Sequence, residues 1–240
     1  MKYSNKHAID RSVAGIGEQN EGSLHAALKQ WISEPGDRFE VNMSGFLIDV
    51  VRRDELFEIQ IKNFSAVRRK LRALVENHRL NLVYPIPLEK WILKIDEKDQ
   101  SVISRRKSPK KGRLIDIFDE LVRIPDLIEY ENFNIIVLLI KEEEIRCDDG
   151  KGSWRRKGTS IVDRKLLEVV SETCFNKKSD FLQFLPTDIH TPFSTKTVAE
   201  VIGCPVYKAR RIIYCLKKMK LISQVGKSGN FLLYERNTST

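Results

Sequence analysis

The stretch "GFLIDVVRRDELFEIQIK", from Gly45 to Lys62, decides the fold, because it predicts two strands joined by a short turn. Isoleucine, valine and phenylalanine favour strands over Phe46–Val51 and Leu56–Ile61. Asp49 and Glu58 interrupt these apolar runs. A buried carboxylate is costly unless something pairs with it, so the stretch suggests that a cation accompanies the two carboxylates.

The segments on both sides of this hairpin predict helices and further strands. Leu24, Ala27, Leu28 and Trp31 recur at helical spacing, and the "PGD" that follows ends the helix. The expected order is a helix over 21–32, strands over 39–43, 46–51 and 56–61, a helix over 63–78 and a strand over 80–84. We expect Pro85 to end this last strand.

The middle of the chain predicts a hairpin, a long strand and two short helices. "KWILKID" and "SVISRRK" favour a hairpin that turns at Glu97–Gln100. The aliphatic run Ile135–Ile140 lies in an expected strand over 133–147 and is too short to cross a membrane. We expect helices near 114–122 and 164–174, the second of which leads into a C-terminal module.

The C-terminal module combines two helices with a hairpin. Ser194–Ile202 and Val206–Met219 predict helices separated by the turn "GCP", and "LISQV" and "FLLYER" predict strands around the tip "GKSGN". Over roughly residues 165–237 the succession resembles a winged helix-turn-helix, which implies contact with DNA, although some winged helices bind protein or only dimerise. The candidate contact residues are Tyr207, Lys208, Arg210, Arg211 and Lys227.

The net charge of +9 is unevenly distributed. Residues 151–240 carry 17 Lys and Arg against 7 Asp and Glu, whereas residues 1–150 carry 25 against 26. This asymmetry favours a polyanion-binding module joined to a nearly neutral one, with a solvated basic surface as the alternative. A second basic cluster is expected to contact the DNA backbone through Arg105, Arg106, Lys107, Lys110 and Lys111.

Other features of the sequence exclude several classes of protein. The four cysteines form no C-x-x-C pair, so we expect neither a zinc site nor a disulfide framework. The N-terminus "MKYSNKHAID" has no apolar segment typical of a secretory signal. No phosphate-binding loop is present, so ATP is not implied. We therefore expect a cytoplasmic protein without a membrane partner.

The two carboxylates of the opening stretch suggest a divalent metal site. Side chains alternate across a strand, so Glu58, Gln60 and Lys62 share one face, and Asp49 approaches Glu58 across the turn. Two neighbouring carboxylates repel each other unless a cation lies between them. Oxygen ligands of this kind suit Mg²⁺, with Mn²⁺ as an alternative, and the neighbouring amide or ammonium would orient water or phosphate.

The order of elements and the spacing D-x8-E-x-Q resemble the PD-(D/E)XK nuclease superfamily over roughly residues 20–85. The resemblance implies that Asp49 and Glu58 bind the metal and that Glu21 supplies a further acidic group. Gln60 stands where most members carry lysine, and some type II restriction endonucleases are similar in having glutamine there. Lys62 is an alternative source of the ammonium group that the usual lysine provides. A shifted register that uses Gln60 and Lys62 as the E-x-K pair stays open.

These patterns combine into one hypothesis. We expect an α/β protein with an N-terminal arm (1–19), a restriction-endonuclease-like αβββαβ core (20–150) and a linker with a winged helix (151–240). The expected function is a Mg²⁺-dependent endonuclease that acts on double-stranded DNA as a monomer or a homodimer. The alternative is a non-catalytic DNA-binding regulator or scaffold on a degenerate nuclease fold.

Overall fold

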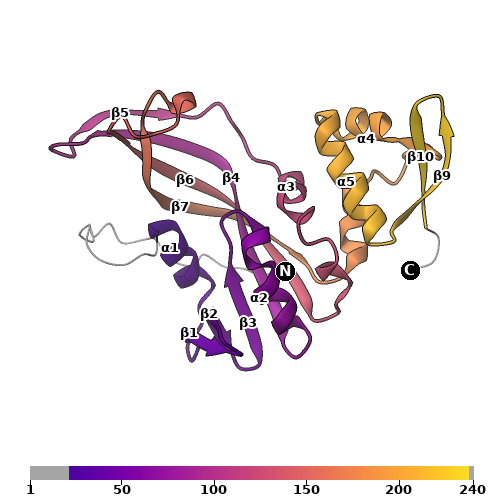
Figure 1. The fold of residues 1–240 in the computed structure, drawn as a ribbon, viewed down its shortest axis with the longest axis horizontal. Coiled ribbons are helices and arrows are strands. Elements are labelled where there is room, and N and C mark those ends of the chain that lie inside the picture. Colours follow the sequence, from indigo (N-terminus) through magenta and orange to yellow (C-terminus); the bar gives the residue numbers. More distant parts are fainter. Residues whose placement is uncertain (1–21, 238–240) are drawn as a thin grey trace.

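The computed structural model describes residues 22–237, which form a large mixed sheet flanked by helices and a smaller C-terminal unit (Figure 1). The helices are α1 (Ser23–Ile32), α2 (Phe64–Val75), α3 (Phe118–Leu121), α4 (Thr195–Ile202) and α5 (Val206–Lys218). The strands are β1 (Arg38–Met43), β2 (Phe46–Arg52), β3 (Glu55–Ile59), β4 (Arg79–Asp96), β5 (Val102–Lys107), β6 (Phe133–Asp148), β7 (Ser160–Phe175), β8 (Phe193–Ser194), β9 (Ile222–Ser228) and β10 (Phe231–Arg236).

The large sheet has the order β1-β2-β3-β4-β6-β7, and β5 pairs with the far part of β4. The neighbours of β4 in this order, β3 and β6, run parallel to it, and the other pairs are antiparallel. The predicted order of helix, three strands, helix and strand is present from α1 to β4. The predicted mixed α/β class is therefore confirmed.

The two long N-terminal helices cover opposite faces of the sheet. Leu24 and Leu28 of α1 share a buried cluster with Phe57 and Ile59 of β3. The α2 helix instead packs with a second cluster, to which the intervening Leu56 belongs. Because successive side chains of a strand point to opposite faces, these two clusters lie on the two sides of the sheet. The hairpin β2–β3 is thus enclosed between α1 and α2.

The strand β4 continues through the prolines that were expected to end it. Pro85 and Pro87 pair in register with Leu138 and Ile140 of β6. The partner β3 ends at the level of Val83, and β5 begins to pair only at Trp91. The backbone N–H of Leu80 points towards β6. Because the backbone N–H direction alternates from one residue of a strand to the next, the nitrogens of Pro85 and Pro87 point the opposite way, into this gap. A proline is tolerated where no neighbouring strand needs its N–H.

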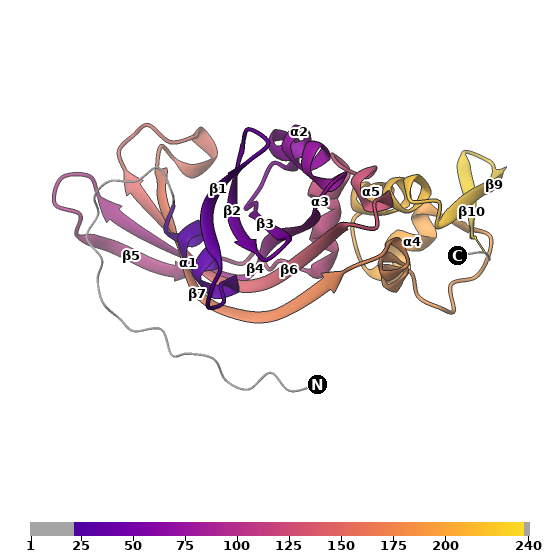
Figure 2. The same cartoon turned by 90° about the horizontal axis from the view of Figure 1, so that it is seen from below.

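The prediction of a helix near 164–174 is wrong, because this segment lies in the strand β7. Figure 2 shows β7 as a long edge strand that curves along the sheet. Three register shifts interrupt its pairing with β6, near Ile140, Glu142 and Arg146. Such bulges break the two-residue alternation of a strand, so the segment lacks the regular pattern that predicts a strand. The sheet therefore extends to Phe175, well beyond the boundary expected at residue 150.

Ion pairs hold together the part of the sheet in which β4, β6 and β7 extend beyond the end of β3. Glu144 of β6 is buried and lies 2.6 Å from Arg146 Nη2 and 3.1 Å from Lys90 Nζ, with Arg164 of β7 at 3.5 Å. Burial opposes ionisation of this carboxyl, but its hydrogen bonds with Arg146 and the charge of Lys90 outweigh burial and hold its pKa below the usual value. The network ties β4, β6 and β7 into a rigid arm.

The C-terminal unit packs against the end of the sheet through a shared apolar core. Ile212 and Leu216 of α5 belong to the same buried cluster as Phe118 of α3 and Leu71 of α2. The predicted helices and hairpin of this unit are present, with Ser194 capping α4 through the backbone N–H of Thr197. Among the described residues, no helix is long and apolar enough to cross a membrane.

Candidate active site

The hairpin β2–β3 brings Asp49 and Glu58 to neighbouring positions. Its register ends with the pair Val50–Phe57, and Asp49 and Glu58 are the next residues on the two strands. The charge of Asp49 acts on the Glu58 carboxyl, and the backbone N–H of Ile59, next to Glu58, donates to Asp49 Oδ2. Both side chains are shielded from solvent, with exposed fractions of 17% for Asp49 and 6% for Glu58. The predicted pairing of these two carboxylates is present in the structure.

Asp49 is held in the ionised form by two donors. Its Oδ2 accepts a hydrogen bond of 2.7 Å from the backbone N–H of Ile59, and His25 Nε2 of α1 lies 3.3 Å from the same oxygen. Burial would raise the pKa of this carboxyl, but the hydrogen bonds from His25 and Ile59 outweigh burial and lower it. Asp49 therefore carries a permanent negative charge, which opposes ionisation of the neighbouring Glu58 carboxyl.

Glu58 behaves in the opposite way. Burial, followed by the nearby charge of Asp49, raises its pKa to about 7 although Lys70 partly offsets both effects. Lys70 Nζ lies 2.5 Å from Glu58 Oε2 and also donates to the backbone carbonyl of Leu47. One carboxyl of the pair is thus ionised at low pH and the other titrates near neutrality, so the site readily takes up a proton or a cation.

Lys70 is a site residue that the sequence analysis missed. It belongs to α2, three positions after Val67 and four before Leu74, both of which pack against the core. Helix positions three and four apart lie on one face, so the periodicity of α2 already placed Lys70 towards the sheet. The strand pattern around Glu58 does not show this placement, because Lys70 lies 12 positions later on a different element.

The other predicted catalytic residues follow the assigned end of β3 at Ile59. The backbone N–H of Gln60 still donates to Val83 of β4 at 2.9 Å, whereas Lys62 lies in the turn that follows. The Gln60 amide donates to the backbone carbonyls of Lys62 and, at 3.4 Å, Asn63. The Lys62 side chain is exposed in the connecting turn. The predicted role of Glu21 falls outside the described residues.

The donor set of the pair fits a hard divalent cation. Within residues 22–237, neither Asp49 Oδ1 nor Glu58 Oε1 accepts a hydrogen bond, so one oxygen of each carboxylate is available. Carboxylate oxygens with several waters are the usual ligands of Mg²⁺. The same part of the chain contains no group of three or more His, Cys, Asp or Glu side chains arranged to enclose a metal. Two carboxylates supplemented by water or phosphate oxygens are the arrangement that these residues permit.

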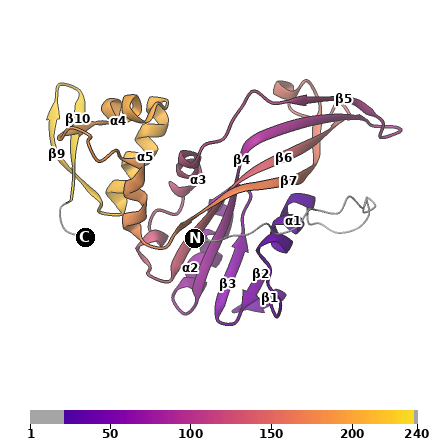
Figure 3. The same ribbon diagram turned by 180° about the vertical axis from the view of Figure 1, so that it is seen from behind.

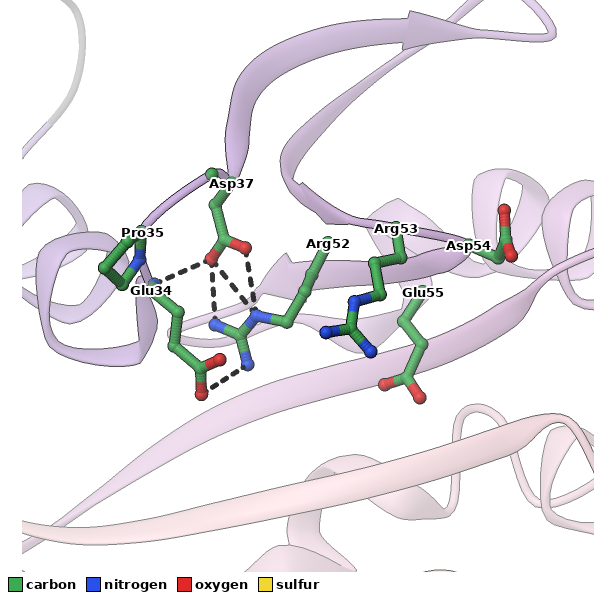
Figure 4. A pocket seen from close by; sticks show the side chains of 8 residues that line it. Glu34, Pro35, Asp37, Arg52, Arg53, Asp54 and Glu55 are labelled. Atoms are coloured by element: carbon green, nitrogen blue, oxygen red, sulfur yellow. Dashed lines mark hydrogen bonds and ion pairs between the residues drawn. The ribbon is translucent and has the colours of Figure 1, made fainter.

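A separate pocket lies at the turn of the same hairpin, lined by residues 34–37 and 52–55 (Figure 4). Arg52 fills it by pairing with Asp37 at 2.8 Å and Glu34 at 3.1 Å and by donating to the carbonyl of Ile32. These contacts satisfy the guanidinium and fasten the end of α1 to β2. The pocket therefore has a structural explanation.

The basic cluster after residue 104 is divided between a strand and a loop. Arg105, Arg106 and Lys107 lie on β5, and Lys110 and Lys111 follow in the exposed loop. Arg105 and Lys107 pair with Glu143 and Glu89, each at 2.7 Å. Both cations also stand over the ring of Trp91. All five side chains are exposed, and those of Arg105 and Lys107 lie on one face of β5.

Two of the predicted contact residues of α5 are used inside the molecule. Lys208 is buried and pairs with Asp116 and, at 3.1 Å, with Asp119. Burial opposes the charge of Lys208, but the hydrogen bonds with the two aspartates raise its pKa above the usual value. Arg211 Nη1 lies 2.6 Å from Asp119. These contacts fasten α5 to α3.

The rest of the predicted α5 and wing surface faces solvent. Tyr207, Arg210 and Lys227 are exposed, as are Lys217 and Lys218 at the end of α5. The alternation of buried and exposed basic residues follows from the position of α5, whose first turns lie between α3 and solvent. The sequence pattern of a basic helix does not show which of its residues pair within the molecule and which face solvent.

Comparison with known families gives the class to which the chain belongs. A family model described as "Domain of unknown function (DUF8091)" matches residues 22–176, and the chain is a member of this family. The match begins one residue before α1 and ends one residue after β7. The family domain therefore corresponds to the large sheet with its helices.

A relative extends the similarity beyond that domain. The chain is 34% identical over 222 residues to an uncharacterized protein of Treponema pallidum (strain Nichols), covering 92% of this chain and 87% of the relative. Because 222 residues cannot fit within residues 1–176, the similarity reaches into the C-terminal unit. No solved structure matches the chain significantly.

Proposed function

We propose that the protein is a metal-dependent nuclease that hydrolyses phosphodiester bonds of DNA. The observation that carries the proposal is the pair of shielded carboxylates, Asp49 and Glu58, with the ammonium group of Lys70 at 2.5 Å from Glu58. Two carboxylates can hold a hard cation that polarises a phosphodiester, and a neighbouring ammonium can stabilise negative charge on the phosphate. The order of elements around them is the one that resembles the PD-(D/E)XK superfamily.

Each residue of the site has a distinct part in this chemistry. Asp49 and Glu58 would hold Mg²⁺ or Mn²⁺, which when bound polarises a phosphodiester and lowers the pKa of a coordinated water. Asp49, kept ionised by His25 and Ile59, provides the permanent charge. Glu58 must lose its proton before it can serve as a ligand, because its pKa is about 7.

Lys70 supplies the ammonium group that position 60 lacks. An ammonium beside the carboxylates stabilises negative charge on a phosphate oxygen, which an amide does only through a hydrogen bond. Lys70 is shielded, with an exposed fraction of 15%, and the carbonyl of Leu47 fixes its position. It therefore fills the role predicted for Gln60 or Lys62 from another element of the fold.

The C-terminal unit would place this site on DNA. Its two helices and hairpin resemble a winged helix, and Arg210, Lys217 and Lys218 face solvent. Exposed basic side chains on a helix bind the phosphate backbone through charge. The excess of basic residues after residue 150 supports the same partner.

A non-catalytic DNA-binding scaffold is the second candidate. The turned-away amide of Gln60 favours it, since the usual lysine position then makes no contribution. The two functions are separated by incubating the full chain with plasmid, single-stranded and branched DNA in Mg²⁺, Mn²⁺ or EDTA. Cleavage that needs a metal and is lost in Asp49→Asn supports the nuclease. DNA binding without cleavage in either metal supports the scaffold.

A further inference from the structure

The loop between β6 and β7 carries the most exposed large apolar side chain of the described residues. Trp154 is 82% exposed. Burial of an aromatic ring of this size is strongly favourable, so its exposure has a cost that the fold alone does not explain. Its environment is cationic, because Arg155, Arg156 and Lys157 follow directly and the Arg155 guanidinium stands 5.5 Å from the ring centre.

The loop that presents Trp154 is rigidly built. Residues Trp154–Arg156 form a short 3-10 turn closed by hydrogen bonds from Arg156 N to Ser153 O and from Lys157 N to Trp154 O. Thr159 Oγ1 donates to Arg156 O at 2.8 Å. At Gly152 a Cβ atom would stand 1.8 Å from the carbonyl oxygen of Thr159, so only glycine fits. The backbone of this turn is therefore ordered before a partner binds, which lowers the entropic cost of binding.

The loop belongs to the basic arm of the sheet. Lys151 reaches across to Glu97 in the β4–β5 turn at 3.3 Å, which links the two loops at this end. Figures 1 and 3 show the arm with β5 at one end of the molecule, the C-terminal unit at the other, and β1, β2 and β3 between them. The β6–β7 loop and the C-terminal unit therefore lie at opposite ends of the molecule.

We infer that the β6–β7 loop is a second nucleic-acid contact, in which Trp154 stacks on an unpaired base while Arg155 and Lys157 bind the flanking phosphates. Aromatic rings with neighbouring cations bind single-stranded segments in this way, because every base has a flat face to stack on. Bases in an intact duplex are already stacked and not accessible to the ring. The inference rests on the proposed function and narrows its substrate to DNA with unpaired bases.

The charge around the ring favours this partner over a protein. Three consecutive cations follow Trp154, and a run of like charges is complemented by a polyanion such as a phosphate backbone. On β5, Arg105 and Lys107 stand over Trp91, which is the same combination of aromatic and basic side chains. A phosphate backbone complements both segments.

The test measures binding of the full-length protein, without divalent metal, to a blunt duplex and to the same duplex with a short single-stranded gap. Trp154→Ala should weaken binding to the gapped DNA about fivefold to a hundredfold, and binding to the duplex less than twofold. Trp154→Phe should restore most of the affinity, because phenylalanine keeps a stacking face. The control is Phe39→Ala, which removes an exposed aromatic ring from β1 and should leave both affinities unchanged.

The outcomes separate this inference from the proposed function. Equal losses on both DNAs, or none, would overturn the stacking role, and binding of a protein by the loop would then be the explanation. Since no metal is present, a loss confined to gapped DNA supports the inference even if no cleavage is ever observed. Cleavage at wild-type rates by Trp154→Ala on gapped DNA, with unchanged affinity, would overturn the inference and leave the nuclease proposal standing.

Discussion

Lys70 Nζ of α2 lies 2.5 Å from Glu58 Oε2 of β3, so a helix supplies the positive charge next to the carboxylate pair. The contact depends on the packing of α2 against the strands, through Leu71 and Leu74. A charge placed this way is independent of the residue at position 60. Under the proposed function, this contact would supply the ammonium group that glutamine at position 60 lacks.

Replacing Lys70 is expected to abolish cleavage. Lys70→Met keeps the aliphatic stem but removes the charge, and we expect the single-turnover rate at saturating Mg²⁺ to fall by a factor of about 10²–10³, as for loss of one group that stabilises transition-state charge. DNA binding should be preserved. Lys62→Ala removes an exposed lysine from the next turn and is the matched control.

The comparison with Gln60 decides which residue takes the lysine role. If Gln60→Ala were more damaging than Lys70→Met, the amide would be the functional group and the contact between Lys70 and Glu58 would be structural. Because Gln60 is bonded to turn carbonyls, we expect its replacement to have the smaller effect.

Asp49→Asn is expected to remove metal binding and to change the titration of its neighbour. Asparagine keeps the size of the side chain but not its charge, so the repulsion that raises the pKa of Glu58 disappears. We expect the pKa of Glu58 to move towards its usual value and cleavage to be lost. Calorimetric titration with Mn²⁺ and cleavage assays check both effects, and unchanged metal affinity would contradict the assignment of Asp49.

Much of the hairpin and of the C-terminal helices is predictable from local pattern, because each of these elements has a clear period of apolar residues. Phe46–Val51 and Val206–Met219 are examples that lie within one residue of β2 and α5. The proximity of Asp49 and Glu58 follows from the short turn between them.

The remaining features depend on contacts between distant segments. The bulges of β7 arise from its fit to β6, and the tolerance of Pro85 depends on where β3 ends. The environment of Lys208 depends on Asp116, in the 3-10 turn before α3, and on Asp119 of α3, which lie 92 and 89 positions earlier in the chain. None of these partners is visible in the local sequence of the residue concerned.

The raised pKa of Glu58 predicts how stability and activity depend on pH. Without metal, the folded protein retains a proton on Glu58 between pH 4.5, the usual value, and about 7, whereas the unfolded chain has lost it. The free energy of unfolding should therefore fall as the pH rises through this window. Glu58→Gln, which cannot ionise, should remove this part of the pH dependence in denaturant titrations.

Metal and proton compete for Glu58 in the same window. Cleavage at low Mg²⁺ should rise with pH to a midpoint near 7, and higher Mg²⁺ should move the midpoint to lower pH, because cation binding favours the ionised form. Single-turnover rates from pH 5.5 to 8.5 at two metal concentrations check this. A midpoint that does not move with metal concentration would mean that Glu58 is not a ligand.

The helix α5 offers a matched pair of substitutions, because Lys208 faces α3 and Arg210 faces solvent. Each substitution by alanine removes one positive charge from the same helix. Lys208→Ala leaves Asp116 and Asp119 without their shared partner, and we expect a loss of about 1–3 kcal/mol in the free energy of unfolding, since both aspartates stay partly solvated. Its effect on the salt dependence of DNA binding should be small.

Arg210→Ala should leave stability within about 0.5 kcal/mol and reduce the slope of log K against log salt by about one. Thermal denaturation and binding titrations over a range of salt concentrations measure both quantities. If Lys208→Ala flattened the salt slope while stability stayed unchanged, Lys208 would contact DNA and its pairing with α3 would be broken in the complex.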